Sequence, residues 1–276
     1  MRYFISLSYC GTGFSGWQIQ PNAPSVEEEL EKGLTLLLGH PVDVVGAGRT
    51  DAGVHASSFV AHFDFPHFDL SDQTDRLCYK LNAILHPGIS IHHIGAIHDQ
   101  AHARFDATSR QYLYFIHLQK DPFIASHSWY CKYDLDFDRM NQGTQRLLGR
   151  RDFSCFEKVN GGNATSICEL TEAIWKPYIP SLDQLGTPKH DLAQSLPNSE
   201  KYPYFVFSIR GNRFLRNMVR AIVGSLIEIG RGKQAPKWID ELLQEGNRSS
   251  AGQSVPGHAL FLSDITYPYP LPWEKK

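Results

Sequence analysis

Apolar residues recur along the chain with two spacings, a period of two and a helical period. The period-two and short apolar runs predict β-strands over residues 2–9, 42–46, 55–65, 89–97, 110–118, 166–179, 202–210 and 258–267. Helical spacing predicts helices over residues 26–38, 77–85, 136–148, 213–229 and 236–245. Helices interleaved with strands in this way predict an α+β protein.

The helix over residues 26–38 has signals at both ends. Ser25 and Glu28 have the capping-box spacing, in which the serine side chain accepts a hydrogen bond from the backbone of the first turn. Gly39 follows the last apolar position and predicts a left-handed C-cap. We therefore expect this helix to begin and end at these residues.

The predicted elements form two α+β layers, residues 1–107 and residues 108–276, each with helices on one face of a mostly antiparallel sheet. The other face of the sheet is then free to hold a ligand. A polar stretch over residues 181–200 is rich in Pro, Ser, Asp, Gln and Lys, which predicts an exposed, mobile insertion between two strands.

Composition narrows the class of protein. The 276 residues are 42% hydrophobic and 20% charged, which excludes a disordered or fibrous chain. The formal net charge is −2, so a nucleic-acid surface requires a local concentration of basic residues. No apolar run reaches the ~18 residues of a membrane span, and the start of the chain alternates like a strand rather than a signal peptide. We expect a cytoplasmic protein without a membrane partner.

Cysteine, histidine and glycine patterns predict no metal site and no small-molecule cofactor. The five cysteines are odd in number and include no Cys-x-x-Cys pair. His92 and His93 are adjacent on an alternating segment and therefore point to opposite faces. The glycine-rich stretch over residues 11–17 lacks the Gly-Lys-Ser/Thr sequence of a phosphate loop and the glycine spacing of a dinucleotide site.

The most unusual segment is residues 46–56, which carries three glycines, Arg49, Asp51 and His55 between two predicted strands. Glycines allow a ligand to approach the backbone closely. In one interpretation Arg49 and Asp51 pair and only rigidify a turn. In the other, Asp51 is a catalytic carboxylate, and Arg49 orients it or the substrate. A lone aspartate argues against an ordinary glycosidase, which needs a second carboxyl group.

Basic residues are concentrated over residues 208–233, which carry six of them, one acidic residue and hence a net charge of +5. The six are Arg210, Arg213, Arg216, Arg220, Arg231 and Lys233. On a helix over residues 213–229, the arginines at 213, 216 and 220 fall within an arc of about 60°. This face has no acidic residue four positions away, which favours phosphate binding over a solvated charged face.

Tyr112 and Tyr114 share one face of the strand over residues 110–118. Tyrosines at such positions usually pack in a core or at a sheet edge. Beside a basic helix, one of them can instead stack on a nucleic-acid base.

Residues 48–56 resemble the signature loop of the tRNA pseudouridine synthase A family, and the resemblance extends over nearly the whole chain. Further matching motifs occupy residues 16–18, 25–34, 81–82, 102–107, 112 and 214–220. The resemblance implies that Asp51 is the catalytic aspartate and Tyr112 the active-site tyrosine. It also implies that Arg220 pairs with the aspartate and that Arg49 is the family's arginine two residues before it. The chain departs from the family in having Ala259 where glycine is usual.

For the fold, the resemblance implies two ferredoxin-like (RRM-like) halves with the active cleft between them, and a homodimer. For the activity, it implies isomerisation of uridine to pseudouridine in the anticodon stem-loop of tRNAs, at three neighbouring uridines (positions 38, 39 and 40). The target base is flipped out, and Asp51 attacks the sugar or the base without a cofactor. Arg210, Arg213, Arg216, Arg231, Lys233 and His55 are then expected to bind RNA.

Two other functions are weighed against this one. The first is a non-catalytic RNA-binding protein of paired RRM-like halves, although neither half has the aromatic strand motif of that module. The second is a hydrolase that uses Asp51, His55 and a divalent metal, although the loop offers only one carboxylate.

Overall fold

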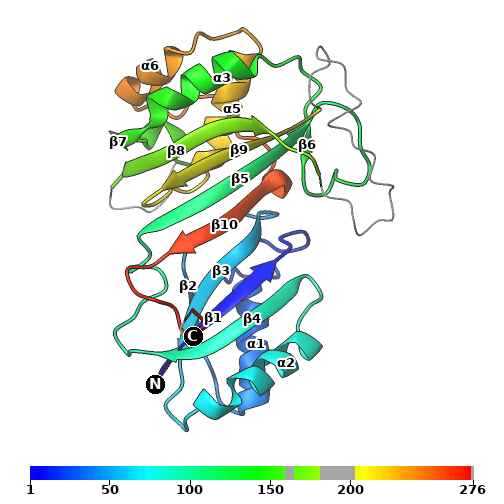
Figure 1. Ribbon diagram of the computed structural model, residues 1–276, viewed down its shortest axis with the longest axis vertical. Helices are drawn as coiled ribbons and strands as arrows, with labels where there is room; N and C mark the ends of the chain where they lie inside the picture. Colours follow the sequence, from blue (N-terminus) through cyan, green and yellow to red (C-terminus); the bar gives the residue numbers. More distant parts are fainter. Residues whose placement is uncertain (159–164, 181–202, 275–276) are drawn as a thin grey trace.

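The computed structural model describes residues 1–158, 165–180 and 203–274, so the predicted insertion over residues 181–200 lies outside the described part. Its strands join in one ten-stranded sheet of order β4-β1-β3-β10-β5-β9-β8-β7, with β2 beside β3 and β6 beside β5 (Figure 1). The strands are β1 Arg2–Tyr9, β2 Val44–Gly46, β3 His55–Asp64, β4 Ile89–Ile97, β5 Ser109–His117, β6 Trp129–Tyr130, β7 Gly149–Asp152, β8 Ile167–Pro177, β9 Tyr204–Gly211 and β10 Leu260–Thr266.

The pairing is mostly antiparallel, with β10 parallel to β3 and β6 parallel to β5. The helices are α1 Val26–Leu38, α2 Thr74–Ile84, α3 Phe137–Thr144, α5 Met218–Gly230 and α6 Trp238–Glu245. Figure 1 shows α1 and α2 at one end of the long sheet and α3, α5 and α6 at the other. The predicted α+β class is confirmed, while the ferredoxin-like description of each half stays a prediction. No helix in the described ranges is long and apolar enough to cross a membrane.

Both predicted ends of α1 are confirmed. The Ser25 hydroxyl accepts a hydrogen bond of 3.3 Å from the Glu28 N–H. Gly39 takes the left-handed conformation with φ +73°, and its N–H donates to the Thr35 carbonyl. Local side-chain chemistry therefore sets these boundaries.

Buried side chains form two clusters, one around β1–β4 with α1 and α2, the other around β5, β8 and β9 with α3, α5 and α6. Strand β10 lies between β3 and β5 and contributes to both, with Leu262 in the first cluster and Leu260 in the second. The last strand of the chain thus joins the two ends of the sheet. The proposed boundary near residue 107 stays a prediction.

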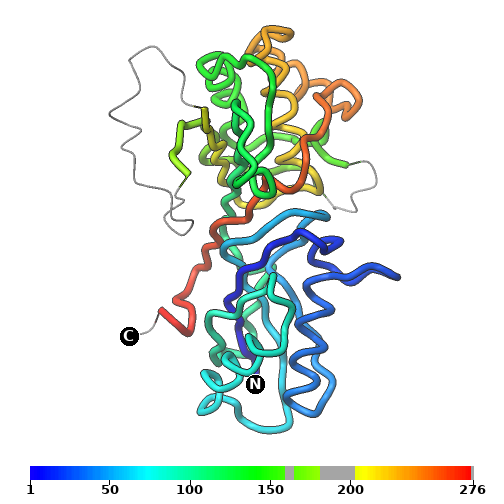
Figure 2. Tube along the Cα trace, turned by 90° about the vertical axis from the view of Figure 1, so that its right-hand side faces the viewer, coloured from blue at the N-terminus to red at the C-terminus, as the bar shows by residue number. Residues whose placement is uncertain are grey.

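The second face of the sheet around β1 is covered, so the expectation of an open face is wrong there. The Tyr267 ring packs edge-on against Phe4 with centroids 5.7 Å apart, and the Trp273 ring stacks on His93. Figure 2 shows this C-terminal segment in red, running along the N-terminal part on the side away from α1. Apolar side chains such as Phe4 are fully buried as a result.

The helix predicted over residues 213–229 begins later, at Met218. Asn217 precedes it in the left-handed conformation with φ +66°, and the Arg216 carbonyl accepts a hydrogen bond from the Lys158 N–H. These two features end the non-helical segment at Asn217. Arg213 and Arg216 therefore lie in a loop, and the predicted helical arc of three arginines is wrong.

Candidate active site

The loop of residues 46–54, here called the aspartate loop, is fixed by contact with the loop over residues 10–17. The Trp17 N–H donates to the Thr50 carbonyl at 3.3 Å, and the Gly53 N–H donates to the Phe14 carbonyl at 3.3 Å. Gly16 has φ +101°, and a Cβ there would lie 2.3 Å from the Thr50 carbonyl oxygen. Only glycine permits this approach, which sets the position of the residue that follows Thr50.

That residue is Asp51, and two arginines from a distant part of the chain face its carboxylate. Arg220, on the first turn of α5, places Nη1 3.2 Å from Asp51 Oδ2. Arg216, in the loop before α5, places Nε 3.9 Å from Asp51 Oδ1. The Asp51 side chain keeps 23% of its surface exposed, so it is oriented by cations and still accessible to a substrate.

Arg220 is itself held by the backbone. Its Nε donates a hydrogen bond of 2.7 Å to the Val255 carbonyl, while Nη1 serves Asp51. The Val255 N–H in turn donates to the Arg220 carbonyl. The segment continues into a 3-10 turn, Gly257–Ala259, in which Ala259 is buried with a negative φ, so alanine fits where the family usually has glycine.

Arg49 does not form the pair with Asp51 that one interpretation of the sequence required. Its side chain is exposed and has no hydrogen bond or ion pair with any residue of the described ranges. Sequence reasoning assigned Arg216 to phosphate binding and did not identify it as the second cation beside Asp51. The turn is instead rigidified by the neighbouring Tyr9–Thr50 hydroxyl pair, 3.0 Å apart.

Tyr112 lies on β5 near this pair of charges. Its ring meets the ring of Phe214 edge-on, with centroids 5.0 Å apart. Burial raises the pKa of Tyr112 to about 12; the nearby Arg110 opposes this shift and Asp51 adds to it. The phenol is therefore protonated at neutral pH, and its ring is fixed between the two ends of the sheet.

Arg110 is a site residue that sequence reasoning missed. Its guanidinium donates to the backbone carbonyls of Ala47, Arg104, Ala107 and Asn212, at 2.7 to 3.2 Å. Ala47 belongs to the aspartate loop, and Asn212 begins the loop that carries Arg216. This one half-buried cation thus joins the segments around Asp51, and its partial burial lowers its pKa. The sequence signal that could have identified it is an arginine on the predicted strand over residues 110–118, two positions before Tyr112.

His55 is placed differently from the prediction that it binds RNA. It is only 1% exposed. Its Nδ1 accepts from the Gly11 N–H at 3.0 Å, and its Nε2 lies 2.9 Å from the His258 carbonyl, to which it donates. Burial lowers the pKa of His55 to about 4, so the ring is neutral at neutral pH. This histidine is a structural link, and the assignment to RNA contact is wrong.

The three predicted phosphate ligands outside the arginine arc, Arg210, Arg231 and Lys233, have acidic partners. Arg210 pairs with Asp264 at 2.9 Å. Arg231 and Lys233 both pair with Glu228, at 2.8 and 3.4 Å. Contact between these three residues and phosphate stays a prediction, in competition with the carboxylates.

A groove with several cationic side chains lies beside the Asp51–Arg220 pair. It is lined by Lys158, Asn217, Arg220, Arg248, Ser249 and Ser254. Arg248 donates to the Ser254 hydroxyl and to the Gly252 carbonyl, which fixes its guanidinium in place. The groove therefore offers positive charge next to an accessible carboxylate, an arrangement suited to a polyanion whose reacting atom lies at Asp51.

The carboxylate of Asp51 belongs to no metal-binding arrangement in the described part of the chain. The one group of three or more suitably close His, Cys, Asp or Glu side chains found there is Cys10, His55 and His127. A hydrolytic metal held by Asp51 and His55 together is not supported by this geometry.

Comparison with known proteins identifies the family of this chain. A family model described as tRNA pseudouridine synthase matches residues 144–268. The chain is 43% identical to the tRNA pseudouridine synthase A of Bacteroides thetaiotaomicron and to that of Porphyromonas gingivalis. Each alignment covers 97% of the chain, and the two cover 91% and 97% of the respective relatives. The corresponding protein of Aliivibrio salmonicida is 36% identical over 97% of the chain and 93% of its own length. The chain belongs to the tRNA pseudouridine synthase A family.

Proposed function

We propose that this protein converts uridine to pseudouridine in tRNA, with Asp51 as the nucleophile. The observation that carries the proposal is the contact of 3.2 Å between Arg220 and Asp51, at an aspartate that remains 23% exposed. A nucleophilic carboxylate must be ionised, aimed and reachable. Arg220 supplies the charge and the direction, because its guanidinium is also tied to the Val255 carbonyl.

The chemistry proposed for Asp51 is an isomerisation. The carboxylate attacks either C1′ of the ribose or the uracil ring, the bond from C1′ to N1 breaks, and the ring turns. A bond from C1′ to C5 then forms, C5 loses its proton to solvent or a base, N1 gains a proton, and the carboxylate is released. The atoms of substrate and product balance, so no oxidant, water or energy source is consumed.

Tyr112 is proposed to receive the flipped base. A nucleotide whose base must be turned during the reaction has to leave its stack, and an aromatic ring replaces part of the lost stacking. The Tyr112 ring is held by Phe214 at 5.0 Å and its phenol is protonated at neutral pH, because its pKa is about 12. We therefore assign it packing and hydrogen-bond donation rather than proton abstraction.

RNA binding is proposed for the groove beside Asp51 and for the exposed cations around it. Lys158 and Arg248 line this groove together with Arg220. Arg49 is exposed and Arg216 keeps 53% of its side chain exposed, so both can meet phosphates. These residues replace part of the predicted basic helix as the surface that holds the backbone near the target uridine.

The proposals for substrate range, assembly and location are based on the family resemblance. We propose that the target is the anticodon stem-loop of tRNAs, at the three neighbouring uridines of positions 38, 39 and 40. We also propose two ferredoxin-like halves with the cleft between them, a homodimer, and a cytoplasmic location. No small-molecule cofactor is needed for the proposed steps.

A tritium-release assay tests the activity. The protein is incubated with tRNA transcript carrying tritium at uridine C5, in the presence of EDTA, and the released tritium is counted. Wild-type protein is expected to release it without shortening the RNA. A binding module would release none, and a metal-dependent hydrolase would be silent in EDTA and would cleave RNA when metal is restored.

Asp51→Asn identifies the nucleophile in the same assay. The amide keeps the shape of the carboxylate but is not a competent nucleophile, so we expect turnover to be abolished while tRNA affinity changes no more than a few-fold. Affinity is measured by filter binding. Single-turnover activity close to wild type would remove Asp51 from the mechanism.

A further inference from the structure

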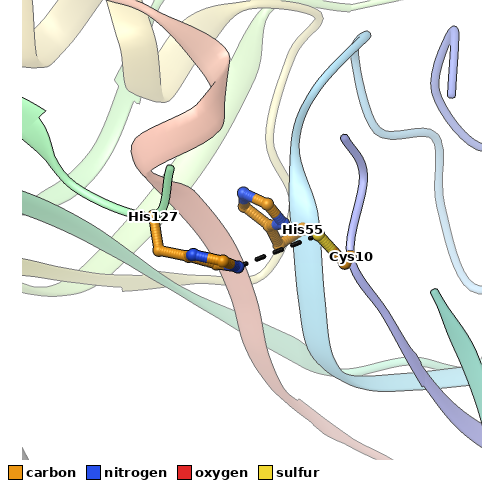
Figure 3. Close-up of side chains that lie close together, drawn as sticks. All are labelled: Cys10, His55 and His127. Carbon is orange, nitrogen blue, oxygen red and sulfur yellow. Dashed lines mark hydrogen bonds between the residues drawn. The ribbon is translucent and has the colours of Figure 1, made fainter. Parts of the chain in front are cut away.

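Cys10, His55 and His127 lie together although they come from three distant segments of the chain. Cys10 follows β1, His55 begins β3, and His127 lies in the segment between β5 and β6. One ligand atom from each lies within 4.8 Å of the others. Figure 3 shows the Cys10 sulfur and the His127 ring facing each other, with the His55 ring beside them.

The ligand atoms lie within 4.8 Å of one another, somewhat farther apart than in an occupied tetrahedral metal site. Zinc binds sulfur at about 2.3 Å and imidazole nitrogen at about 2.0 to 2.1 Å, so two ligand atoms on one zinc are separated by about 3.3 to 3.6 Å. Cys10 Sγ and His127 Nε2 are already 3.8 Å apart. His127 is exposed, so its side chain can move toward the other two ligands.

Each histidine also has a partner on the ring nitrogen that faces away from the cluster. His127 Nδ1 lies 2.7 Å from the Ser126 hydroxyl. His55 Nε2 donates to the His258 carbonyl at 2.9 Å. Histidines that bind metal almost always have their second nitrogen bonded in this way, because the bond fixes the tautomer and aims the free lone pair.

We propose that Cys10, His55 and His127 bind a thiophilic divalent cation of the zinc class. The ligands are Cys10 Sγ, His127 Nε2 and His55 Nδ1, and the Cys10 thiol gives its proton to solvent as the sulfur–metal bond forms. Three protein ligands leave a fourth position for water. The site lies outside the machinery proposed for uridine isomerisation and does not depend on that activity.

Occupation has one structural cost. His55 Nδ1 accepts a hydrogen bond of 3.0 Å from the Gly11 N–H, and the metal must replace this bond. Gly11 belongs to the loop over residues 10–17, which also contacts the aspartate loop. A bound cation would in exchange connect the segment before β6 to the start of β3 and to the loop that follows β1.

Zinc binding is measured by competition with a chromophoric chelator, with the thiols kept reduced by a phosphine. Wild-type protein is expected to bind one zinc ion, and Cys10→Ser and His127→Ala each to weaken binding at least ~10-fold. Cobalt provides a second readout, since a thiolate–cobalt charge-transfer band should appear in wild type and be absent from Cys10→Ser. Zinc should also raise the Tm of wild type and leave that of His127→Ala unchanged. His55 is left intact because its ring is a structural link.

His67→Ala is the matched control, because His40 and His67 form another close pair of rings, with centroids 3.6 Å apart. It should bind zinc like wild type. Asp51→Asn should do so as well, which separates this proposal from the proposed catalysis. Absence of stoichiometric binding to wild type, unchanged affinity in both Cys10→Ser and His127→Ala, or loss of binding in His67→Ala would each overturn the assignment.

Discussion

Arg220→Lys distinguishes a residue that orients Asp51 from one that only contacts RNA phosphate. The arginine uses two nitrogens, with Nη1 3.2 Å from the Asp51 carboxylate and Nε 2.7 Å from the Val255 carbonyl. Lysine keeps the positive charge but has a single ammonium group in place of the planar fork. It can serve one of these acceptors well and leaves the other without its donor.

The magnitude follows from that lost geometry. The charge of the cation is conserved, so the long-range attraction to Asp51 largely remains. What is lost is one charge-assisted hydrogen bond, worth about 1.5 to 3 kcal/mol where the groups are partly buried. If the aspartate is then misdirected in the transition state, kcat should fall by at least ~10-fold, since 1.4 kcal/mol corresponds to a factor of ten. The KM for tRNA should change little.

Steady-state tritium release measures both parameters. Arg2→Lys is the control, because Arg2 also pairs with an aspartate, Asp64, at 2.7 Å, at the start of β1 and away from Asp51. It should leave kcat and KM unchanged. A rise of KM alone in Arg220→Lys would make this residue a phosphate ligand and refute its role as the partner of the aspartate.

Three further outcomes are expected. Gly16→Ala should lower kcat at least ~10-fold and the free energy of unfolding by about 1 to 3 kcal/mol, because φ is +101° and the methyl would lie 2.3 Å from a carbonyl of the aspartate loop. Gly13→Ala, strained at φ +88° but without any contact within 4 Å in the described structure, should spare kcat. Burial lowers the pKa of both His55 and His62 to about 4. The contribution of each neutral histidine to the free energy of unfolding is therefore fully present above the unfolded-state pKa of about 6.5. Urea unfolding should show this contribution lost as the pH falls, about 2 kcal/mol per histidine by pH 5, and a flat profile would contradict it. Arg213→Gln should make the slope of log K against log[salt] for tRNA shallower by about 0.7 to 0.9, and an unchanged slope would place the RNA elsewhere.

Local patterns in the sequence were sufficient to predict helix ends and strand positions where the interactions that determine them are themselves local. Ser25 and Gly39 set the ends of α1 because a cap acts on the backbone of its own turn. The alternation of apolar residues located β1, β3, β4, β5 and β9, since the period of side chains in a strand is fixed by its pleat. The glycine-rich loop with its single carboxylate also stood out, because that combination of residue types is unusual on any turn.

Periodicity failed where helical and non-helical backbones bury the same residue. Leu215 is buried in the loop before α5, as it would be on a helix, so its spacing continued the helical pattern past the true start. The left-handed conformation of Asn217 and the bond between the Lys158 N–H and the Arg216 carbonyl decided the boundary. The second of these contacts joins residues 58 positions apart and leaves no local trace in the sequence.

Only the tertiary structure brought the charges of the site together. Asp51 and Arg220 are separated by 169 residues and meet because β10 joins the two ends of the sheet between β3 and β5. The same long-range packing buried His55, exposed Arg49 and placed Cys10 beside His127, 117 residues away. Sequence sets which chemical groups are present and the local conformations of the backbone. The distances between those groups depend on strand order and on which faces are covered, and these are properties of the whole folded chain.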